Sequence, residues 1–471
     1  MSVAAPQPVS FNPWWRLAHD LWLEREWKEP LPPGAPDFSI RRTHRFSYDP
    51  LPILFEQYRR HGPVFTLRLL HARGVFLLGP EANHHMLVSH AENFRWRDGG
   101  FVDLIPLLGD GLLTIDGDYH RRARRIMLPA FHGDRIAAAQ EVMATETLRA
   151  LEDWRDGEEL PLYDRTRALT LRVAMGALFG FDSDGATDGL DPAAEFERAL
   201  NWYGRDFFLR TLRGPFTPWR RMHTARRRLD RLLYAEIARR RAREEEPGED
   251  ILSLLIAARD EDGSGFTDRE VRDQVMTLLF AGHDTTTSTV AFLFHELAGH
   301  PEALERLLDE QERVLGGRVP TAAELTGEAL PELEMAIDET LRLYPPAWIG
   351  PRRCVEPFEF AGQRIPGGVP VAYCSWASHR LPEVFPEPDE FRPRRFAPEE
   401  KAKLPKGAYV PFGAGSRTCI GMRFGQMEVR TIAALILQRF VLRQRPGYQM
   451  AVRLMPTLSP RDGLPMVVSA R

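Results

Sequence analysis

The chain has 471 residues, of which 43% are hydrophobic, and a formal net charge of -4 at pH 7. This composition is typical of an enzyme that buries a large core, and the near-balanced charge gives no reason to expect nucleic acid as a partner. Three cysteines without a C-x-x-C pair argue against a disulfide framework and a structural zinc site, and they favour a reducing cytosol.

The N-terminal segment from Phe11 to Trp27 carries four tryptophans among charged residues. It is too short and too charged to span a bilayer, and it lacks the basic start, apolar run and cleavage site of a signal peptide. An amphipathic helix resting on a membrane surface is one interpretation. Packing against the protein's own surface is the interpretation we favour.

Most of the remaining chain shows helical periodicity, and no internal repeat is found. Runs of β-branched, aromatic and other apolar residues favour strands in a few places. These places are 64–67, 75–78, 358–365, 369–373 and 464–468.

A strongly apolar stretch leads into Ala281-Gly282-His283-Asp284-Thr285, which predicts a long, mostly buried helix interrupted by polar residues. The hydroxyl of Thr285 can turn back to the carbonyl of Ala281, and Gly282 weakens the same turn. We expect a local kink with room for water. An ordinary helix with a threonine-rich polar face is the alternative.

Glu339 and Arg342 lie three residues apart in an apolar-periodic stretch that ends at Pro345, so they share one helix face. A lone pair of this kind is usually a solvated surface salt bridge. The spacing of Glu339 and Arg342 therefore does not by itself distinguish a surface salt bridge from a buried structural pair.

The run from Phe412 to Gly421, FGAGSRTCIG, places Cys419 before a stretch with helical spacing. Free amides and the dipole at a helix N-terminus are expected to lower the thiol pKa. Gly413 permits turns that a side chain forbids, and Gly421 leaves room for a flat ligand. The loop thus predicts a thiolate that holds iron, whereas Cys354 and Cys374 are expected to be small buried hydrophobic residues.

Five residues of this loop match the haem-binding signature F-x-x-G-x-R-x-C-x-G of the cytochrome P450 family: Phe412, Gly415, Arg417, Cys419 and Gly421. The other segments follow in the order that the family shows. The chain therefore resembles a haem-thiolate enzyme of soluble, bacterial type over nearly its whole length. The resemblance implies a mainly α fold with a small β-rich region, a triangular prism in which haem lies between the Thr285 helix and the Cys419 helix.

The resemblance also implies site roles. Haem b would take its axial thiolate from Cys419. Asp284 and Thr285 would relay protons to dioxygen, and His283 would point away from the haem. The remaining haem contacts would come from His120, Arg124, Arg352 and Arg417, which bind the propionates, and from Phe412, Gly413, Gly421 and Ala281.

The P-x-R-F element of the family is matched by Pro393-Arg394-Arg395-Phe396. Its arginine, Arg395, would join Glu339 and Arg342 in a buried structural triad. Pro32-Pro33-Gly34 resembles the hinge that precedes the catalytic domain. We therefore expect an N-terminal extension, residues 1–34, and a single catalytic domain, residues 35–471.

The implied reaction inserts one oxygen atom of O2 into a C–H or C=C bond of a hydrophobic fatty acid, terpenoid or steroid-like molecule. Arg205 or Arg210 could anchor a carboxylate, although a solvated face is favoured for both. By family position, the substrate pocket would include Phe101, Leu104, Phe280, Ala281, Ala347, Ile349 and Pro456.

No nucleotide-binding motif occurs in the chain, so electrons are expected from a ferredoxin or flavodoxin with its reductase. Arg121, Arg122, Arg125 and Arg423 flank segments expected near the cysteine side of the haem, where an acidic donor could dock. The expected location is the cytoplasm.

Two rival functions remain open. A peroxide-driven peroxygenase or isomerase on the same fold usually departs from the acid–threonine pair, and retention of Asp284 and Thr285 counts against it. A non-enzymatic haem sensor or carrier would have no use for the polar break in the long helix.

Overall fold

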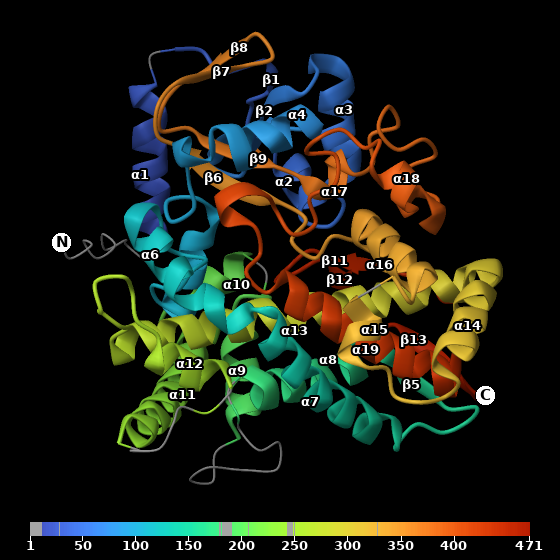
Figure 1. The fold of residues 1–471 in the computed structure, drawn as a ribbon. Helices are drawn as coiled ribbons and strands as arrows, with labels where there is room; N and C mark the ends of the chain where they lie inside the picture. Colours follow the sequence, from blue (N-terminus) through green and yellow to red (C-terminus); the bar gives the residue numbers. More distant parts are fainter. Residues whose placement is uncertain are drawn as a thin grey trace.

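The structure is a computed structural model that describes residues 12–27, 29–178, 180, 191–205, 207–242, 248, 250–326 and 328–471. The main sheet lies at the top of Figure 1, most helices lie below it, and smaller sheets such as that of β5 and β13 lie among them, so the expected mainly α class with a small β-rich region is confirmed. The expected N-terminal helix is α1 (Pro13–Glu26), and Phe11 lies outside the described residues.

The main sheet has the strand order β1-β2-β3-β9-β6-β4. Helices α2, α3 and α17 lie beside it in Figure 1. Gly34, the last residue of the expected extension, pairs with Thr66, so the extension already belongs to this sheet. The bounds are β1 (Gly34–Ala35), β2 (Val64–Leu69), β3 (Ala72–Leu77), β4 (Phe94–Arg95), β6 (Gly350–Cys354), β9 (Pro370–Tyr373), α2 (Ile40–Phe46), α3 (Leu51–His61) and α17 (Ser375–Ser378).

The strands expected at 64–67, 75–78, 369–373 and 464–468 are confirmed as β2, β3, β9 and β13 (Pro465–Ala470). Residues 358–365 form a hairpin and not one strand, β7 (Phe358–Phe360) and β8 (Gln363–Ile365). Ala361 and Gly362 adopt φ of 47° and 72°, which reverses the chain. Strand β6 was missed because its sequence, GPRRC, has no apolar alternation.

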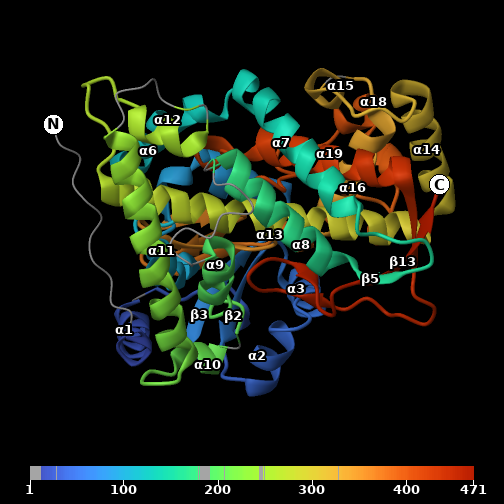
Figure 2. The ribbon, with the colours of Figure 1, turned by 90° about the horizontal axis from the view of Figure 1, so that it is seen from below.

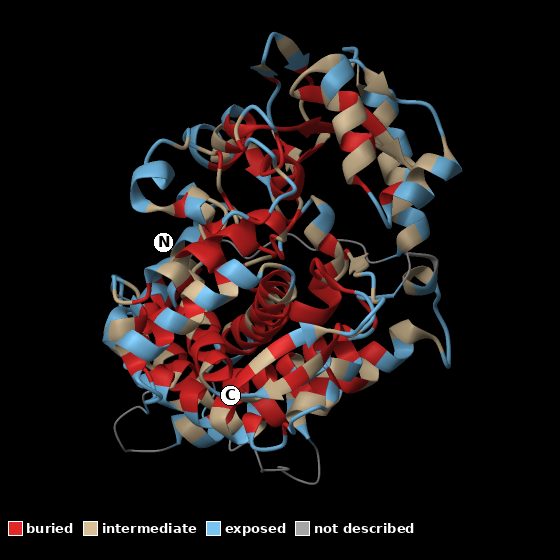
Figure 3. Cartoon of the chain, turned by 90° about the vertical axis from the view of Figure 1, so that its right-hand side faces the viewer, coloured by how far each residue is buried: buried red, intermediate tan, exposed pale blue. Residues whose placement is uncertain are grey.

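The helical part is built around α13 (Asp268–Gly299), seen almost end-on and red in the centre of Figure 3. A capping box begins this helix, since Thr267 and Glu270 each bond the other's backbone amide. Most of its residues are buried on every face, which is typical of a central helix. Its neighbours include α8 (Leu162–Val173), α11 (Pro218–Arg241), α16 (Pro331–Leu343) and α19 (Met422–Arg439).

The other helices are all shorter than α13. They are α4 (Pro80–His84), α5 (Ile105–Leu108), α6 (Gly117–Met127), α7 (Gly133–Leu151), α9 (Pro192–Leu200), α10 (Phe207–Thr211), α12 (Ile251–Ala257), α14 (Pro301–Leu315), α15 (Ala322–Thr326) and α18 (Pro398–Lys401). The 3-10 turns are η2 (Ala91–Asn93), η3 (Gly100–Leu104), η4 (Leu128–Phe131), η6 (Pro393–Phe396) and η7 (Gly415–Arg417), and the π-helical turns are η1 (His85–Ser89) and η5 (Ala174–Leu178). Strands β5 (Glu159–Pro161) and β10 (Phe440–Gln444) flank β13, and β11 (Val452–Arg453) pairs with β12 (Ser459–Pro460).

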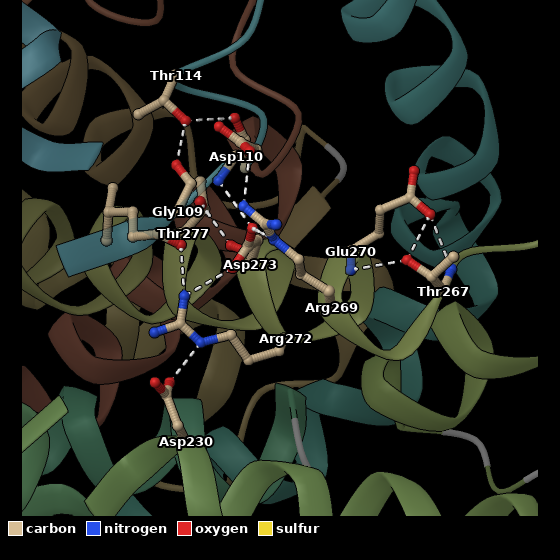
Figure 4. Close-up of polar contacts among 12 residues, drawn as sticks. Gly109, Asp110, Thr114, Asp230, Thr267, Arg269, Glu270, Arg272, Asp273 and Thr277 are labelled. Atoms are coloured by element: carbon tan, nitrogen blue, oxygen red, sulfur yellow. Dashed lines mark hydrogen bonds and ion pairs between the residues drawn. The ribbon is translucent and has the colours of Figure 1, made fainter. Parts of the chain in front are cut away.

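A polar network joins the first half of α13 to the segment after α5 (Figure 4). The carboxylate of Asp273 accepts the backbone N–H of Asp110 at 2.8 Å and the guanidinium of Arg272 at 2.7 Å. Arg272 also reaches Asp230 of α11 at 2.5 Å. At Gly109, with φ of 81°, a Cβ would lie 2.2 Å from Asp273 Oδ1, so only glycine permits this approach. The segment that follows leads directly to Asp116 at the candidate site.

Candidate functional site

Cys419 lies in a tight loop between η7 and α19. Its backbone N–H donates to the carbonyl of Phe412 at 2.9 Å, which closes the loop. Gly413 and Gly415 adopt φ of 68° and 64°, and a Cβ on Gly415 would lie 2.2 Å from the Leu87 carbonyl oxygen. These two positions therefore need glycine to present the cysteine.

The pKa of the Cys419 thiol without a bound metal ion is raised, whereas the helix N-terminus was expected to lower it. Desolvation raises the thiol pKa, and the backbone of Gly421 and the Arg124 guanidinium lower it only in part. Helix α19 begins at Met422, so Cys419 lies three residues before its first turn. A metal ion bound to the sulfur would supply the positive charge that keeps it a thiolate.

The structure brings Arg124 of α6, Arg352 of β6 and Arg417 of η7 together near Cys419. Burial lowers the pKa of Arg352 and of Arg417 to about 10, so both stay charged at neutral pH. His120 belongs to the same group, but burial and the neighbouring arginines lower its pKa to about 3. His120 is thus neutral at neutral pH and could contact a carboxylate as a hydrogen-bond donor.

Asp116 and Trp96, which no motif indicated, complete this group. Arg417 donates to Asp116 at 2.6 Å, and the Arg352 guanidinium lies 3.5 Å from the centroid of the Trp96 ring. One nitrogen of Arg352, Nη2, is buried without a hydrogen-bond partner among the described residues. Three arginines face one carboxylate, so a ligand with two carboxylates would neutralise the remaining charge.

Thr285 lies within α13, which stays helical through the polar segment. Its hydroxyl donates to the carbonyl of Ala281 at 2.7 Å. Asp284 is 1% exposed, and its Oδ1 lies 3.1 Å from Arg167 Nε of α8. The other oxygen, Oδ2, has no partner within the described chain. Arg167 has no motif of its own, and only the packing of α8 on α13 places it there.

His283 is fully buried, in line with the packing role expected for it. Its Nδ1 lies 3.1 Å from the carbonyl oxygen of Leu279, and its ring meets the ring of Phe196 edge-on. Burial lowers its pKa.

Glu428 of α19 is a buried acid that the sequence analysis missed. Its Oε2 accepts the hydroxyl of Thr286 at 3.0 Å, and its Oε1 has no partner among the described residues. Burial raises its pKa to about 8, so it is mostly protonated at neutral pH. A single carboxyl within the apolar run of α19 was the signal that could have revealed it.

Glu339, Arg342 and Arg395 meet in the expected arrangement. Arg342 makes a bidentate pair with Glu339, at 2.7 and 2.9 Å, and Arg395 Nε lies 3.3 Å from the same carboxylate. The first two side chains are fully buried. The alternative of a solvated surface pair is therefore wrong for these residues.

The expected pocket residues occupy different surroundings. Leu104 and Phe280 are buried, Phe101 and Ile349 are partly buried, and Ala347 is exposed. Phe101 stacks on Trp96, and Phe280 meets Tyr203 edge-on at 6.0 Å. Ala281 and Pro456 are also partly buried.

Arg210 does not occupy the solvated face that was favoured for it. Its guanidinium lies 3.8 Å from Asp103 and 5.2 Å from the centroid of the Tyr203 ring. Arg205 is exposed.

The four arginines expected at a docking surface are mostly paired within the chain. Arg122 lies 3.1 Å from Glu270, Arg125 lies 2.7 Å from Asp260, and Arg121 pairs with Asp118. Arg423 is exposed, and no ion pair joins it to another described residue.

Both cysteines outside the loop are buried as expected. Burial raises the pKa of Cys354 to about 11 and that of Cys374 to about 12, so both are neutral thiols.

Comparison with known proteins gives a consistent result. The family model Cytochrome P450 matches residues 44–460. Cyclooctat-9-en-7-ol 5-monooxygenase of Streptomyces melanosporofaciens is 36% identical, with 90% of this chain and 92% of that protein covered. Cyclooctatin synthase of the same species is 35% identical, with 91% of this chain and 93% of that protein covered.

The solved structure described as retinoic acid bound cyanobacterial CYP120A1 is similar with a TM-score of 0.84 at 28% identity. The match covers 94% of this chain and 99% of that one. This similarity confirms the expected fold, and the family match and the curated relatives confirm the expected class of enzyme. The chain belongs to the cytochrome P450 family and is one of its monooxygenases.

Proposed function

We propose that the protein inserts one oxygen atom of O2 into a C–H or C=C bond of a hydrophobic, terpenoid-like molecule, with Cys419 as the iron ligand. The main support is the loop that presents Cys419, whose backbone turns require glycine. Beside it, three arginines share the single carboxylate of Asp116 among the described residues. Two relatives with names based on cyclooctat-9-en-7-ol and cyclooctatin support this substrate class.

Family membership implies a haem with cysteine thiolate ligation, dioxygen and an external electron donor. When bound, the haem supplies the oxidising chemistry, and thiolate ligation favours O–O cleavage. The residues present fit this group. Arg124, Arg352 and Arg417 would hold its two carboxylates, while neutral His120 would offer a hydrogen bond.

The loop and α13 would enclose the haem from opposite sides. Phe412 and Gly413 would lie on the sulfur side, and Ala281 on the other. A Cβ at Gly421 would meet nothing within 4 Å, which leaves room for a flat group beside Cys419.

Proton movement is assigned to α13. The carboxylate oxygen of Asp284 without a partner, Oδ2, would take up a proton and pass it through the hydroxyl of Thr285 to the oxygen being reduced. Arg167 Nε lies 3.1 Å from the other oxygen, Oδ1, so protonation of Asp284 would weaken this ion pair. Electrons would come from a ferredoxin or flavodoxin with its reductase.

The test is the substitution Cys419→Ser in protein produced with added haem precursor. The wild type should give a red-shifted thiolate band with carbon monoxide, and the variant should lose this band and all turnover. Cys354→Ala is the matched control, because its sulfur lies in the β-rich part and is a neutral thiol. A folded Cys419→Ser protein that keeps the band would refute the assignment.

A further inference from the structure

Helix α1 packs on the sheet through its charged face. Glu24 accepts the side chain of Arg68 at 2.8 Å and the backbone N–H of Arg73 at 3.0 Å. One turn earlier, Asp20 lies 3.2 Å from Arg353 of β6 and 3.3 Å from His71. The helix is therefore fixed in one rotation about its own axis by ion pairs.

This rotation leaves the aromatic residues of α1 in water. Trp14 is 72% exposed, and Trp15, Leu21 and Trp22 are also exposed. None of the residues of α1 is buried. A helix of a monomeric globular protein normally presents the opposite face outward, because burial of apolar surface is what holds it in place.

Two further segments add exposed apolar residues at the same end of the molecule. Phe216, between α10 and α11, is 90% exposed, and Leu209 and Leu212 beside it are exposed. Phe38 and Ile40 at the start of α2 are exposed as well. Helices α1, α2 and α10 lie along the lower edge of Figure 2.

Helix α1 and the α10–α11 region are also in direct proximity, because residues of both line one small pocket. The side chain of Arg16 in α1 pairs with Asp103, which Arg210 of α10 approaches to 3.8 Å. We call this surface the tryptophan face; it comprises Trp14, Trp15, Leu21, Trp22, Phe38, Ile40, Leu209, Leu212 and Phe216.

Positive charge accompanies the tryptophan face. Residues 207–229 contain seven arginines and no acidic residue, although Arg210, Arg226 and Arg228 pair with carboxylates outside this stretch. Arg220 and Arg221, in the first turn of α11, are exposed, and neither forms an ion pair with another described residue. This part of the surface therefore attracts anions.

We propose that the tryptophan face docks the protein on the surface of an anionic lipid bilayer. Tryptophan prefers the boundary between headgroups and acyl chains, and arginine beside it pairs with anionic headgroups. Among the described residues no helix is long and apolar enough to cross a membrane, so the contact is peripheral. The exposed aromatic residues and the unpaired arginines are accounted for together by this one partner.

The experiment uses the full-length, haem-loaded protein and vesicles of phosphatidylcholine, with or without phosphatidylglycerol. Flotation should recover the wild type with the mixed vesicles and much less of it with phosphatidylcholine alone. Trp14→Ser/Trp15→Ser/Trp22→Ser and, separately, Arg220→Gln/Arg221→Gln should each weaken binding about tenfold. Val319→Ser, an exposed apolar residue outside the tryptophan face, should bind like the wild type.

The α1 variants remove no buried side chain, so an unchanged thermal midpoint would show that they are folded. Absence of vesicle binding by the wild type would overturn the proposal, as would equal binding by all variants. A wild-type dimer that the triple tryptophan substitution splits, without lipid binding, would assign the face to a second copy and also overturn it. Flotation needs no turnover, so its failure is distinct from failure of the proposed reaction.

Discussion

At the scale of single residues, two buried carboxyls, Asp284 and Glu428, lie in different surroundings at the polar segment of α13. Asp284 Oδ1 lies 3.1 Å from Nε of the Arg167 guanidinium. Among the residues that the structure describes, Glu428 has only the Thr286 hydroxyl as a hydrogen-bond partner, and its pKa rises to about 8. The two carboxyls therefore differ in their neighbours, because Asp284 has the Arg167 cation of α8 beside it.

The pKa of Glu428 predicts a pH-dependent stability. Between its unfolded value, about 4.3, and its folded value, about 8, the folded protein holds a proton that the unfolded chain releases. This contribution to the free energy of unfolding is fully present below the unfolded pKa and is lost as pH rises through the folded pKa.

Glu428→Gln removes this titration. We expect the variant to flatten the fall in the free energy of unfolding between about pH 5 and pH 8, by a few kcal/mol. Denaturant unfolding at several pH values measures it. Glu312→Gln, at an exposed position of α14, should leave the wild-type profile unchanged. Parallel profiles for wild type and Glu428→Gln would contradict the assignment.

The Thr285 hydroxyl gives a second prediction at this scale. Thr285→Ala should lower product formed per electron consumed by about tenfold or more, because a proton donor at the reacting oxygen is lost. Peroxide-driven turnover should change much less. Thr289→Ala, one turn along α13, is the matched control, since the Thr289 hydroxyl donates to the backbone carbonyl of Thr285. Equal losses with O2 and with peroxide would refute a proton-transfer role.

At the scale of elements, the contact of α16 with the loop that carries η6 includes one buried carboxylate that binds three partners. Glu339 receives Arg342 of its own helix, Arg395 of η6 and the backbone N–H of Arg392. Because Arg342 is fully buried, loss of the opposing charge leaves a desolvated cation.

Glu339→Gln should therefore lower the free energy of unfolding by about 3–5 kcal/mol and reduce haem content. Denaturant titration and the ratio of haem to protein absorbance measure the two effects. Glu302→Gln, at an exposed position of α14, should change neither. A stable Glu339→Gln protein with full haem content would show that the triad contributes little.

At the scale of the whole molecule, the internal pairing of Arg121, Arg122 and Arg125 changes the expected docking surface for an electron donor. Arg423, next to the cysteine loop, remains exposed. An acidic donor steered by this charge should reduce the protein more slowly as salt increases.

Arg423→Glu should slow reduction several-fold at low salt, with little difference at high salt, as measured by stopped-flow spectroscopy. Arg443→Glu, an exposed position of β10, is the control for net charge. Reduction that is insensitive to salt in both variants would exclude electrostatic steering.

Local patterns determined a large part of this protein. The Cys419 loop motif indicated the family, and the apolar run before Ala281 predicted the central helix, because residue spacing and glycine requirements are local properties. Alternation and β-branching likewise indicated four of the strands.

Only the tertiary structure decided which charges meet. Arg167 beside Asp284, Asp116 beside Arg417 and the neutral state of His120 depend on residues distant in the chain. The same is true of α1, whose composition predicted an amphipathic helix but not which face would be inward. Electrostatic energies and desolvation depend on distance and burial in space, and sequence spacing does not contain these quantities.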